Sequence, residues 1–453
     1  MAHSLLQSFN VDDARAATPV FLVEDGAIDG LDVPESLKKL ARLNRFSGEA
    51  GAVLSGEGGV LYGVGDGTDA LITAGLSDKL PDGVYHFATS LTARAARLAC
   101  LGWLMGAYRF DRYKTASAAS ARLIAPENVD VEAARRAAEA NMLARDLVNT
   151  PAGDMTPEAI EAAARALAKT YGAEIAVTLG DALLTENFPM IHAVGRAAAS
   201  APRLIDLAWG RADAPKLTLI GKGVAFDSGG LNIKNAKGMS LMKKDMGGAA
   251  HALALGQMVM GAGLDVRLRV LVPAVENAIS GNAFRPGDVL ASRKGLTVEI
   301  GNTDAEGRLI LADALALAAE EKPDLVVTLA TLTGAARVAL GPELVPFYCD
   351  DDGLADRLSA AAESEADPLW RMPLWANYQS MLSSSIADVN HISGNAFAGS
   401  VIAALFLKRF AGDHPWVHFD LYAWRPKAAP GRPVGAEAQA IRALYAVFEQ
   451  RFG

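Results

Sequence analysis

Two carboxylates and an arginine lie close together in residues 302–311, NTDAEGRLIL, directly before an apolar run with helical spacing. One residue separates Asp304 from Glu306, and Arg308 follows after one more. Alternate residues line one side of an extended backbone, so the two carboxylates share a side only if this segment is extended or looped. We therefore expect an extended ligand segment, with a helix that starts after Gly307.

Arg308 would then lie in the first turn of that helix. Backbone N–H groups at a helix N-terminus and a guanidinium together form a site for an anion. The alternative is an ordinary surface arginine, which the local sequence alone favours.

Two further segments place charged residues beside glycines. GKGVAFDSGG contains Lys222 and Asp227, with Lys234 seven residues after that aspartate, and LMKKDMGGAA contains Asp245. A single aspartate or lysine at the end of a strand usually caps a loop or is solvated. Together with residues 302–311, however, these segments supply four carboxylates, and four such groups that converge repel one another unless cations compensate them.

Two divalent ions that share carboxylates are the simplest compensation. Such pairs occur in two-metal hydrolases, where they clamp the substrate and activate water. The sequence contains no H-E-x-x-H or H-x-H motif, and its seven histidines are scattered, so structural or exposed roles suit them better than metal binding. Oxygen ligands would therefore hold the metals, helped by a lysine in its neutral form, which adjacent cations favour by lowering its pKa.

The elements that must position these residues alternate between strand and helix in the second part of the chain. This alternation predicts a parallel or mostly parallel sheet covered by helices on both faces, with ligand sites at the carboxyl ends of its strands. The expected strands lie within residues 216–226, 266–275, 324–335 and 416–424, and the expected helices within 249–261, 307–321 and 399–410.

A chain of 453 residues is long enough for two domains. Residues 1–125 read as a small α/β domain, and residues 126–150 as a connecting segment with a charged helix at 131–148. Residues 151–453 form the larger α/β domain, which begins where Pro151, Gly153 and Pro157 interrupt the chain. Thr156 is expected to cap the helix that follows, with Pro157 in its first turn.

The composition argues against several classes of partner. The 43 basic and 52 acidic residues give a net charge of −9 without long blocks of one sign, so we expect no nucleic acid or anionic membrane surface as partner. Cys100 and Cys349 have no C-x-x-C spacing, which suits a reduced, cytoplasmic protein. Residues 1–20 lack the pattern of a signal peptide, and no apolar run approaches the roughly 20 residues of a membrane helix.

In this order, the segments resemble the leucyl aminopeptidase (cytosol aminopeptidase) family of dinuclear metallopeptidases. NTDAEGRL matches the family signature without a change, and ENAISGNAFRPGDV and TLATLTGA match further family segments. The resemblance covers essentially residues 140–425. It implies a small, variable N-terminal α/β domain and a larger catalytic metallopeptidase domain, assembled as a cytoplasmic homohexamer.

The resemblance also implies a role for each matching residue. Two metals, Zn or Mn with Mg or Co as alternatives at the looser site, would be held by Lys222, Asp227, Asp245, Asp304 and Glu306. Lys234 and Arg308 would be the catalytic residues, with a bicarbonate held by Arg308 as general base. The positions near the substrate would be Met242, Asn302, Thr331, Leu332 and Gly334.

The implied activity is that of a metal-dependent exopeptidase. It would remove an apolar, leucine-like N-terminal residue from peptides by means of a water activated by two metals. A dinuclear hydrolase of another bond, such as a phosphoester, and an inactive hexameric scaffold or binding protein are the alternatives. The chain departs from the usual family sequence in SGNAFAGS and LYAWRPKAAPGRPVG, near the end that helps to line the substrate pocket.

Overall fold

The computed structural model describes residue 9 and residues 17–116 and 120–453. Residues 1–20, whose sequence lacks the pattern of a signal peptide, therefore lie largely outside the described residues. The chain divides into two compact units, Met1–Met142 with Lys427–Val434 and Leu143–Pro426 with Gly435–Gly453. The domain boundaries expected from the sequence, near residues 125 and 151, stay a proposal.

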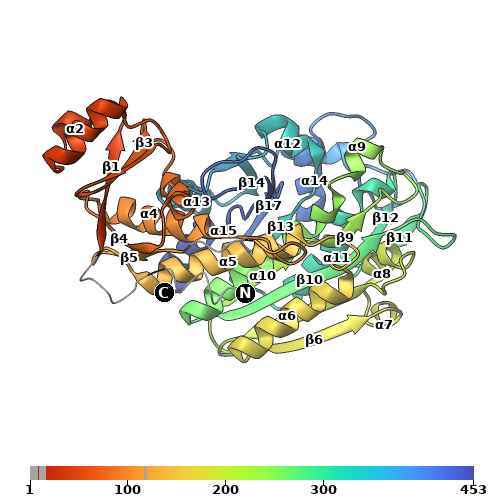
Figure 1. The fold of residues 1–453 in the computed structure, drawn as a ribbon. Coiled ribbons are helices and arrows are strands. Elements are labelled where there is room, and N and C mark those ends of the chain that lie inside the picture. Colours follow the sequence, from red (N-terminus) through yellow and green to blue (C-terminus); the bar gives the residue numbers. More distant parts are fainter. Residues whose placement is uncertain (1–8, 10–16, 117–119) are drawn as a thin grey trace. The chain divides into compact units, whose positions relative to one another are not determined.

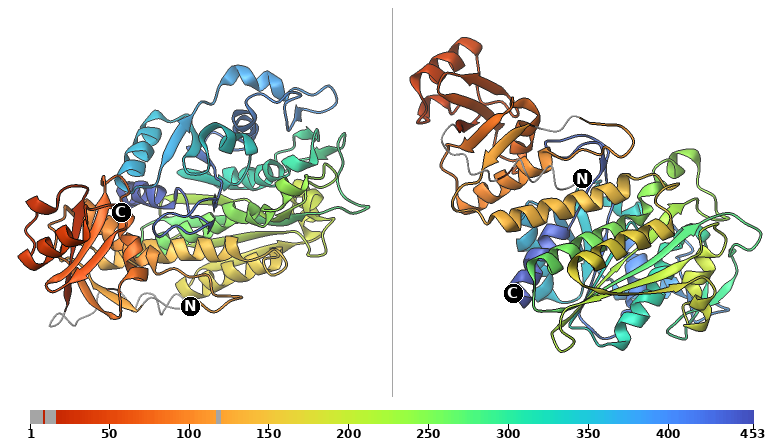
Figure 2. Two further views of the ribbon diagram at one scale, coloured as in Figure 1. Left: turned by 45° about the horizontal axis from the view of Figure 1, so that its top comes forward. Right: turned by 60° about the horizontal axis from the view of Figure 1, so that its bottom comes forward.

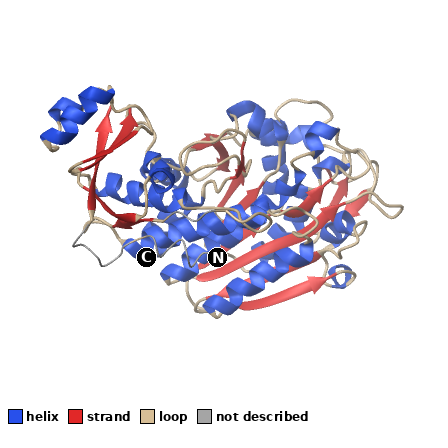
Figure 3. Ribbon diagram, viewed as in Figure 1, coloured by secondary structure: helices blue, strands red, loops and turns tan. Residues whose placement is uncertain are grey.

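The first unit is built on a five-stranded mixed sheet in the order β2-β3-β1-β4-β5 (Figures 1 and 3). The strands β1, β3, β4 and β5 run parallel, and β2 is antiparallel to β3. The strands are β1 (Thr18–Glu24), β2 (Val53–Gly56), β3 (Gly59–Gly65), β4 (Gly83–Phe87) and β5 (Ala121–Ile124). The helices are α2 (Glu35–Asn44), α3 (Leu76–Lys79) and α4 (Ala93–Gly106), and short 3-10 turns are η2 (Ile28–Gly30) and η3 (Ile72–Gly75).

One helix runs from the first unit into the second, and a further helix follows it within the second unit. α5 spans Val131–Asn149, as the charged periodic sequence predicts, and α6 spans Pro157–Tyr171. The Thr156 side chain accepts a hydrogen bond from the backbone N–H of Ala159, so the predicted N-cap is confirmed. α6 ends at Gly172, whose left-handed conformation suits glycine.

The second unit contains a nine-stranded sheet in the order β15-β14-β17-β13-β8-β10-β7-β6, with β9 also paired to β10. The central strands β17, β13, β8 and β10 are parallel, which confirms the mostly parallel sheet. The main strands are β6 (Glu174–Leu179), β7 (Arg203–Trp209), β8 (Lys216–Gly221), β9 (Gly223–Asp227), β10 (Arg267–Asn277), β13 (Leu325–Ala330), β14 (Val345–Cys349), β15 (Leu369–Met372) and β17 (Trp416–Asp420). Small additional strands are β11 (Val289–Ala291), β12 (Thr297–Glu299), β16 (Val389–Asn390), β18 (Trp424–Arg425) and β19 (Gly435–Ala436).

Helices cover both faces of this sheet. α6 and α10 pack on one face, and α8 and α11 on the other (Figures 1 and 2). All six residues of β13 are buried, because a central parallel strand is covered on both sides. The helices are α7 (Ala182–Thr185), α8 (Pro189–Gly195), α9 (Ala236–Met239), α10 (Gly247–Ala262), α11 (Gly307–Glu320), α12 (Gly334–Leu340), α13 (Asp352–Ser364), α14 (Gly399–Lys408) and α15 (Ile441–Phe452). Three 3-10 turns are η4 (Met242–Met246), η5 (Thr303–Ala305) and η6 (Ala376–Leu382).

The N-terminus of α10 lies against the backbone of the central strands. The carbonyl of Lys222, directly after β8, accepts a hydrogen bond from the N–H of Ala249, and Lys222 itself donates its N–H to the carbonyl of Leu329 in β13. A Cβ atom on Gly248 would lie 2.7 Å from the backbone nitrogen of Lys222 and would also overlap the carbonyl of Leu329. This close approach requires glycine, and it sets α10 directly beside the ends of β8 and β13.

None of the helices that the structure describes is long and apolar enough to cross a membrane.

We expect Gly248→Ala to lower the midpoint of thermal unfolding, although alanine is intrinsically the better helix former. The added methyl group would meet rigid backbone, and overpacking of this kind costs about 1–3 kcal/mol. Differential scanning fluorimetry would measure the midpoint, with Gly261→Ala in the exposed last turn of the same helix as the matched control. An unchanged midpoint for Gly248→Ala would contradict the close contact.

Candidate metal centre

The charged residues singled out in the sequence meet at the carboxyl ends of central strands. Lys222 follows β8 directly, and Asp227 is the last residue of β9. Asp245 lies in η4, immediately before α10, whereas Asp304 lies in η5 and Glu306 directly precedes α11. Strands, turns and helix starts from three parts of the sequence therefore deliver these side chains to one place.

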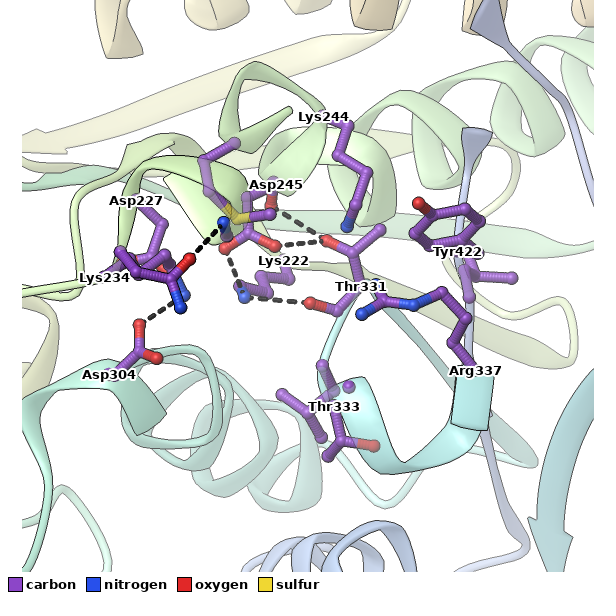
Figure 4. A pocket seen from close by; sticks show the side chains of 16 residues that line it. Lys222, Asp227, Lys234, Lys244, Asp245, Asp304, Thr331, Thr333, Arg337 and Tyr422 are labelled. Carbon is purple, nitrogen blue, oxygen red and sulfur yellow. Dashed lines mark hydrogen bonds and ion pairs between the residues drawn. The ribbon is translucent and has the colours of Figure 1, made fainter. Parts of the chain in front are cut away.

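Three of the carboxylates form a compact buried group. Asp227, Asp245 and Glu306 each offer an oxygen atom, and these atoms all lie within 4.8 Å of one another. Lys222 inserts its ammonium group among them, with its Nζ 2.5 Å from Asp245 Oδ2 and 3.0 Å from Glu306 Oε1 (Figure 4 shows the first contact). The same Nζ donates to the carbonyl oxygen of Thr331 at 3.0 Å.

A second lysine joins the fourth carboxylate to the group. The Nζ of Lys234 is 2.7 Å from Asp227 Oδ2 and also contacts Asp304 Oδ1 (Figure 4). Each of the two lysines thus touches two carboxylates. Positive charge is therefore already concentrated where the carboxylates converge.

The electrostatics show that these lysines do not fully compensate the acidic group. Burial, followed by the negative charge of Asp227, raises the pKa of Glu306 to about 8. The same two causes raise the pKa of Asp304 to about 6. Asp304 is therefore mostly ionised at neutral pH, whereas Glu306 needs additional positive charge nearby to ionise, and hard divalent cations supply such charge to oxygen ligands.

The donor set therefore fits divalent metal ions. The residues that could hold them are the four carboxylates and Lys222. Burial lowers the pKa of Lys222, but the charges of Asp245 and Glu306 outweigh burial and raise that pKa above its usual value. Adjacent divalent cations would act in the opposite direction and favour the neutral amine, the form that can be a ligand.

An asparagine that the sequence reasoning did not single out holds the group together. The side-chain nitrogen of Asn277, at the end of β10, donates to Asp227 Oδ1 at 2.8 Å, to the carbonyl of Thr303 at 3.0 Å and to Glu306 Oε2 at 3.4 Å. It is completely buried. A polar residue at the carboxyl end of a predicted apolar strand was the signal that could have identified it.

The predicted extended conformation of NTDAEGR is wrong. Residues Thr303–Ala305 form the 3-10 turn η5, and only Asn302 before it is extended. The turn is fixed by side chains, because Asn302 Oδ1 accepts from the N–H of Asp304 at 2.8 Å and Thr303 Oγ1 donates to the carbonyl of Gly229 at 2.6 Å. Asp304 and Glu306 therefore reach the same centre around a turn, and the helix starts at Gly307 itself.

Arg308 lies in the first turn of α11, as expected, but it is buried rather than on the surface. Its Nη1 donates to the carbonyl oxygen of His391 at 2.7 Å, and its Nε has no hydrogen-bond partner among the described residues. Burial lowers its pKa to about 10, so it remains a cation at neutral pH. Burial and the charge of Arg308 lower the pKa of His391 to about 3, which suits the structural role expected of the histidines.

A cavity of about 300 Å³ opens beside the carboxylates. Of the residues predicted from the sequence, those that line it are Lys222, Asp227, Lys234, Met242, Asp245, Asp304, Thr331, Leu332 and Gly334. Asn302, Glu306 and Arg308 are not among its lining residues. Lining residues that the sequence reasoning missed include Asn235, Lys244, Thr333, Arg337 and Tyr422. Tyr422 belongs to LYAWRPKAAPGRPVG, so the departure from the usual family sequence was the available signal for it.

Comparisons with known proteins agree along nearly the whole chain. Residues 142–445 match the catalytic domain of the cytosol aminopeptidase family, and residues 29–126 match the N-terminal domain of M17 aminopeptidases. A probable cytosol aminopeptidase from Geobacter sp. (strain M21) is 38% identical over 468 residues, which cover 94% of this chain and 93% of that protein. One from Roseiflexus castenholzii is 42% identical over 364 residues, which cover 76% of this chain and 74% of that protein.

Solved structures give the same result. The crystal structure of cytosol aminopeptidase from Coxiella burnetii superposes with a TM-score of 0.93 at 42% identity, covering 98% of this chain and all of that one (100%). The bottromycin maturation enzyme BotP in complex with Mn superposes with a TM-score of 0.87 at 34% identity, covering 96% of this chain and 100% of that one. With both domains matched and the acidic centre in place, the chain belongs to the cytosol aminopeptidase (M17) family and is an aminopeptidase of that family.

Proposed function

We propose that this enzyme removes the N-terminal residue, apolar and leucine-like, from peptides with the help of two divalent metal ions, Zn or Mn, with Mg or Co as alternatives at the looser site. The observation that carries the proposal is the buried group of Asp227, Asp245 and Glu306 beside a small cavity. Lys222 and Asp304 complete the proposed ligand set. When bound, the metals would supply an activated water and polarise the scissile carbonyl.

Lys234 is proposed to stabilise the oxyanion that develops on the scissile carbonyl. Its side chain lines the cavity, and contacts with Asp227 and Asp304 hold its ammonium group in place. Burial lowers its pKa, but Asp227, Asp304 and Glu306 together outweigh burial and raise that pKa above its usual value, so Lys234 donates as a cation at neutral pH. A donor fixed before the reaction stabilises developing charge without the cost of reorienting solvent.

Arg308 is proposed to hold an anion, bicarbonate, that accepts a proton from the attacking water. The support is its buried guanidinium, which has one Nε–H without a partner in the described part of the chain. The backbone N–H groups at the start of α11 add to the attraction for an anion.

Apolar side chains favour an apolar first residue. Met242, Leu332 and Leu421 line the cavity beside the carboxylates, together with Thr331 and Gly334. Asn302 is proposed to act near the substrate through the turn that it caps. The cytoplasmic homohexamer implied by the family resemblance is part of the same proposal, with peptides as substrates.

The activity itself can be tested with two chromogenic substrates. We expect hydrolysis of leucine p-nitroanilide that disappears after chelation and returns with Mn²⁺ or Zn²⁺, because the carboxylates need the metals to act on the substrate. Hydrolysis of p-nitrophenyl phosphate, assayed in parallel, should stay at background. Phosphatase activity alone would favour a hydrolase of another bond, and no activity in protein with verified metal content would favour a scaffold.

Glu306→Gln keeps the size of the side chain but removes its charge. We expect both metal content and kcat/KM to fall, the latter by more than about 100-fold, because even residues that only orient metal ligands cost about 10–100-fold when mutated. Metal content would be measured by mass spectrometry of the purified protein. Glu320→Gln in the last turn of the same helix, where Glu320 pairs with Arg293, is the matched control. Normal metal content and turnover in Glu306→Gln would refute its role as a ligand.

Arg308→Ala should separate turnover from metal binding. We expect nearly normal metal content with kcat lowered by roughly 100-fold, since a positioned general base typically contributes that much, and partial recovery on addition of bicarbonate. Steady-state assays across a bicarbonate series would measure the recovery. Loss of both metals in this variant would instead make Arg308 a structural residue.

A further inference from the structure

One wall of the cavity carries positive charge that the proposed mechanism does not use. Lys244, Arg337 and Tyr422, which we call the cationic wall, lie together on one side of the cavity, and Asp227 and Asp304 lie on the other (Figure 4). The Nζ of Lys244 is 5.1 Å from the centroid of the Tyr422 ring, and the Cζ of Arg337 is 4.9 Å from it. The tyrosine ring thus makes cation–π contacts with two cations at one end of the cavity.

No carboxylate of the described residues forms an ion pair with Lys244, although the nearby charge of Asp245 offsets part of the cost of burial. Lys244 is only 5% exposed, and its side chain makes no hydrogen bond or ion pair with any described residue. Asp245, its neighbour in sequence, is engaged by Lys222 and by the hydroxyl of Thr331. Arg337, which is exposed, likewise has no ion pair within the described ranges. The other two lysines of the cavity, Lys222 and Lys234, each contact two carboxylates.

A buried ammonium group without an ion pair is costly, and a contact with an aromatic ring does not neutralise it. A second cation beside the same ring adds repulsion. An anion placed between them would remove both costs. Lys244 therefore lines the cavity without an ion pair, as expected of a side chain that binds a negatively charged ligand.

We propose that the cationic wall is a subsite for a carboxylate of the substrate, bound by Lys244 and Arg337 at the end of the cavity away from Asp227 and Asp304. This inference rests on the proposed aminopeptidase function. It adds acidic first residues, or dipeptides, to the peptides with an apolar first residue that are proposed above. Two sources present the required carboxylate close to a scissile bond. One is the side chain of an N-terminal aspartate or glutamate, and the other is the C-terminal carboxylate of a dipeptide.

Two substrate pairs distinguish these sources. Glutamyl and glutaminyl p-nitroanilide have the same shape and differ in the charge of the first side chain, and Leu-Leu and Leu-Leu-amide differ in the C-terminal charge. With the metal-loaded full-length enzyme we expect the charged member of at least one pair to have a kcat/KM about 10-fold higher, as a hydrogen bond to a charged group would give.

Lys244→Met should bring that ratio close to one, and Arg337→Met should reduce it. Lys237→Met is the matched control, because Lys237 is an exposed lysine of nearby α9 that does not line the cavity, and it should keep the wild-type ratio. A midpoint of thermal unfolding at or above that of the wild type would confirm that Lys244→Met folds, since it removes a buried charge that has no ion pair.

Calorimetric titration of free glutamate and glutamine into the Mn-loaded enzyme gives a readout that does not depend on turnover. Stronger binding of glutamate, lost in Lys244→Met, would assign the subsite to an acidic first residue. A ratio that changes only for the dipeptide pair would assign it to the C-terminal carboxylate. If wild-type enzyme cleaves leucine p-nitroanilide but prefers neither charged substrate, the subsite is refuted. If it does not cleave leucine p-nitroanilide, the aminopeptidase proposal fails, and the titration still decides whether the wall binds a carboxylate.

Discussion

Mutual repulsion among buried carboxylates is the constraint on which the catalytic unit depends. Asp227, Asp245 and Glu306 bring negative charge within 4.8 Å, in a buried place where water screens it only weakly. Lys222 and Lys234 offset part of that charge and lower the pKa of Asp245, whereas burial and the charge of Asp227 still raise the pKa values of Glu306 and Asp304. The surrounding elements hold this unfavourable group in place. The ends of strands supply the side chains, and α10 packs directly against the strands because Gly248 has no side chain.

Much of this arrangement could be predicted because its determinants are local. A run such as LVVTLA predicts a buried parallel strand, and β13 is one. Thr156 followed by Pro157 predicts the start of a helix, and the cap forms. Charged residues beside glycines, directly after apolar runs, indicated the edge of the sheet where Asp227 lies. The uninterrupted signature around Asp304 then identified the family, which the comparisons show.

The features that could not be predicted are set by partners distant in the sequence. The turn at residues 303–305 forms because Thr303 bonds to the backbone of Gly229, and no pattern within NTDAEGR reports that contact. In the sequence, Asn277 resembles any polar residue at the end of a strand. Its role follows only from the three acceptors that surround its side chain in the folded structure. The segment MKKDM likewise does not show that Lys244 lacks an ion pair. That property depends on Asp245, which contacts Lys222 and Thr331 instead.

The bonds of Asn277 also bear on when the metal site comes into existence during folding. One amide group joins the end of β9, the turn η5 and the residue before α11, so the hydrogen bonds that hold these segments together require β10 to be in place. A chain with an incomplete sheet presents its carboxylates separately, as weak and scattered ligands. Metal affinity is therefore coupled to the completion of the fold. A bound metal pair would stabilise the state in which the central strands are fully assembled.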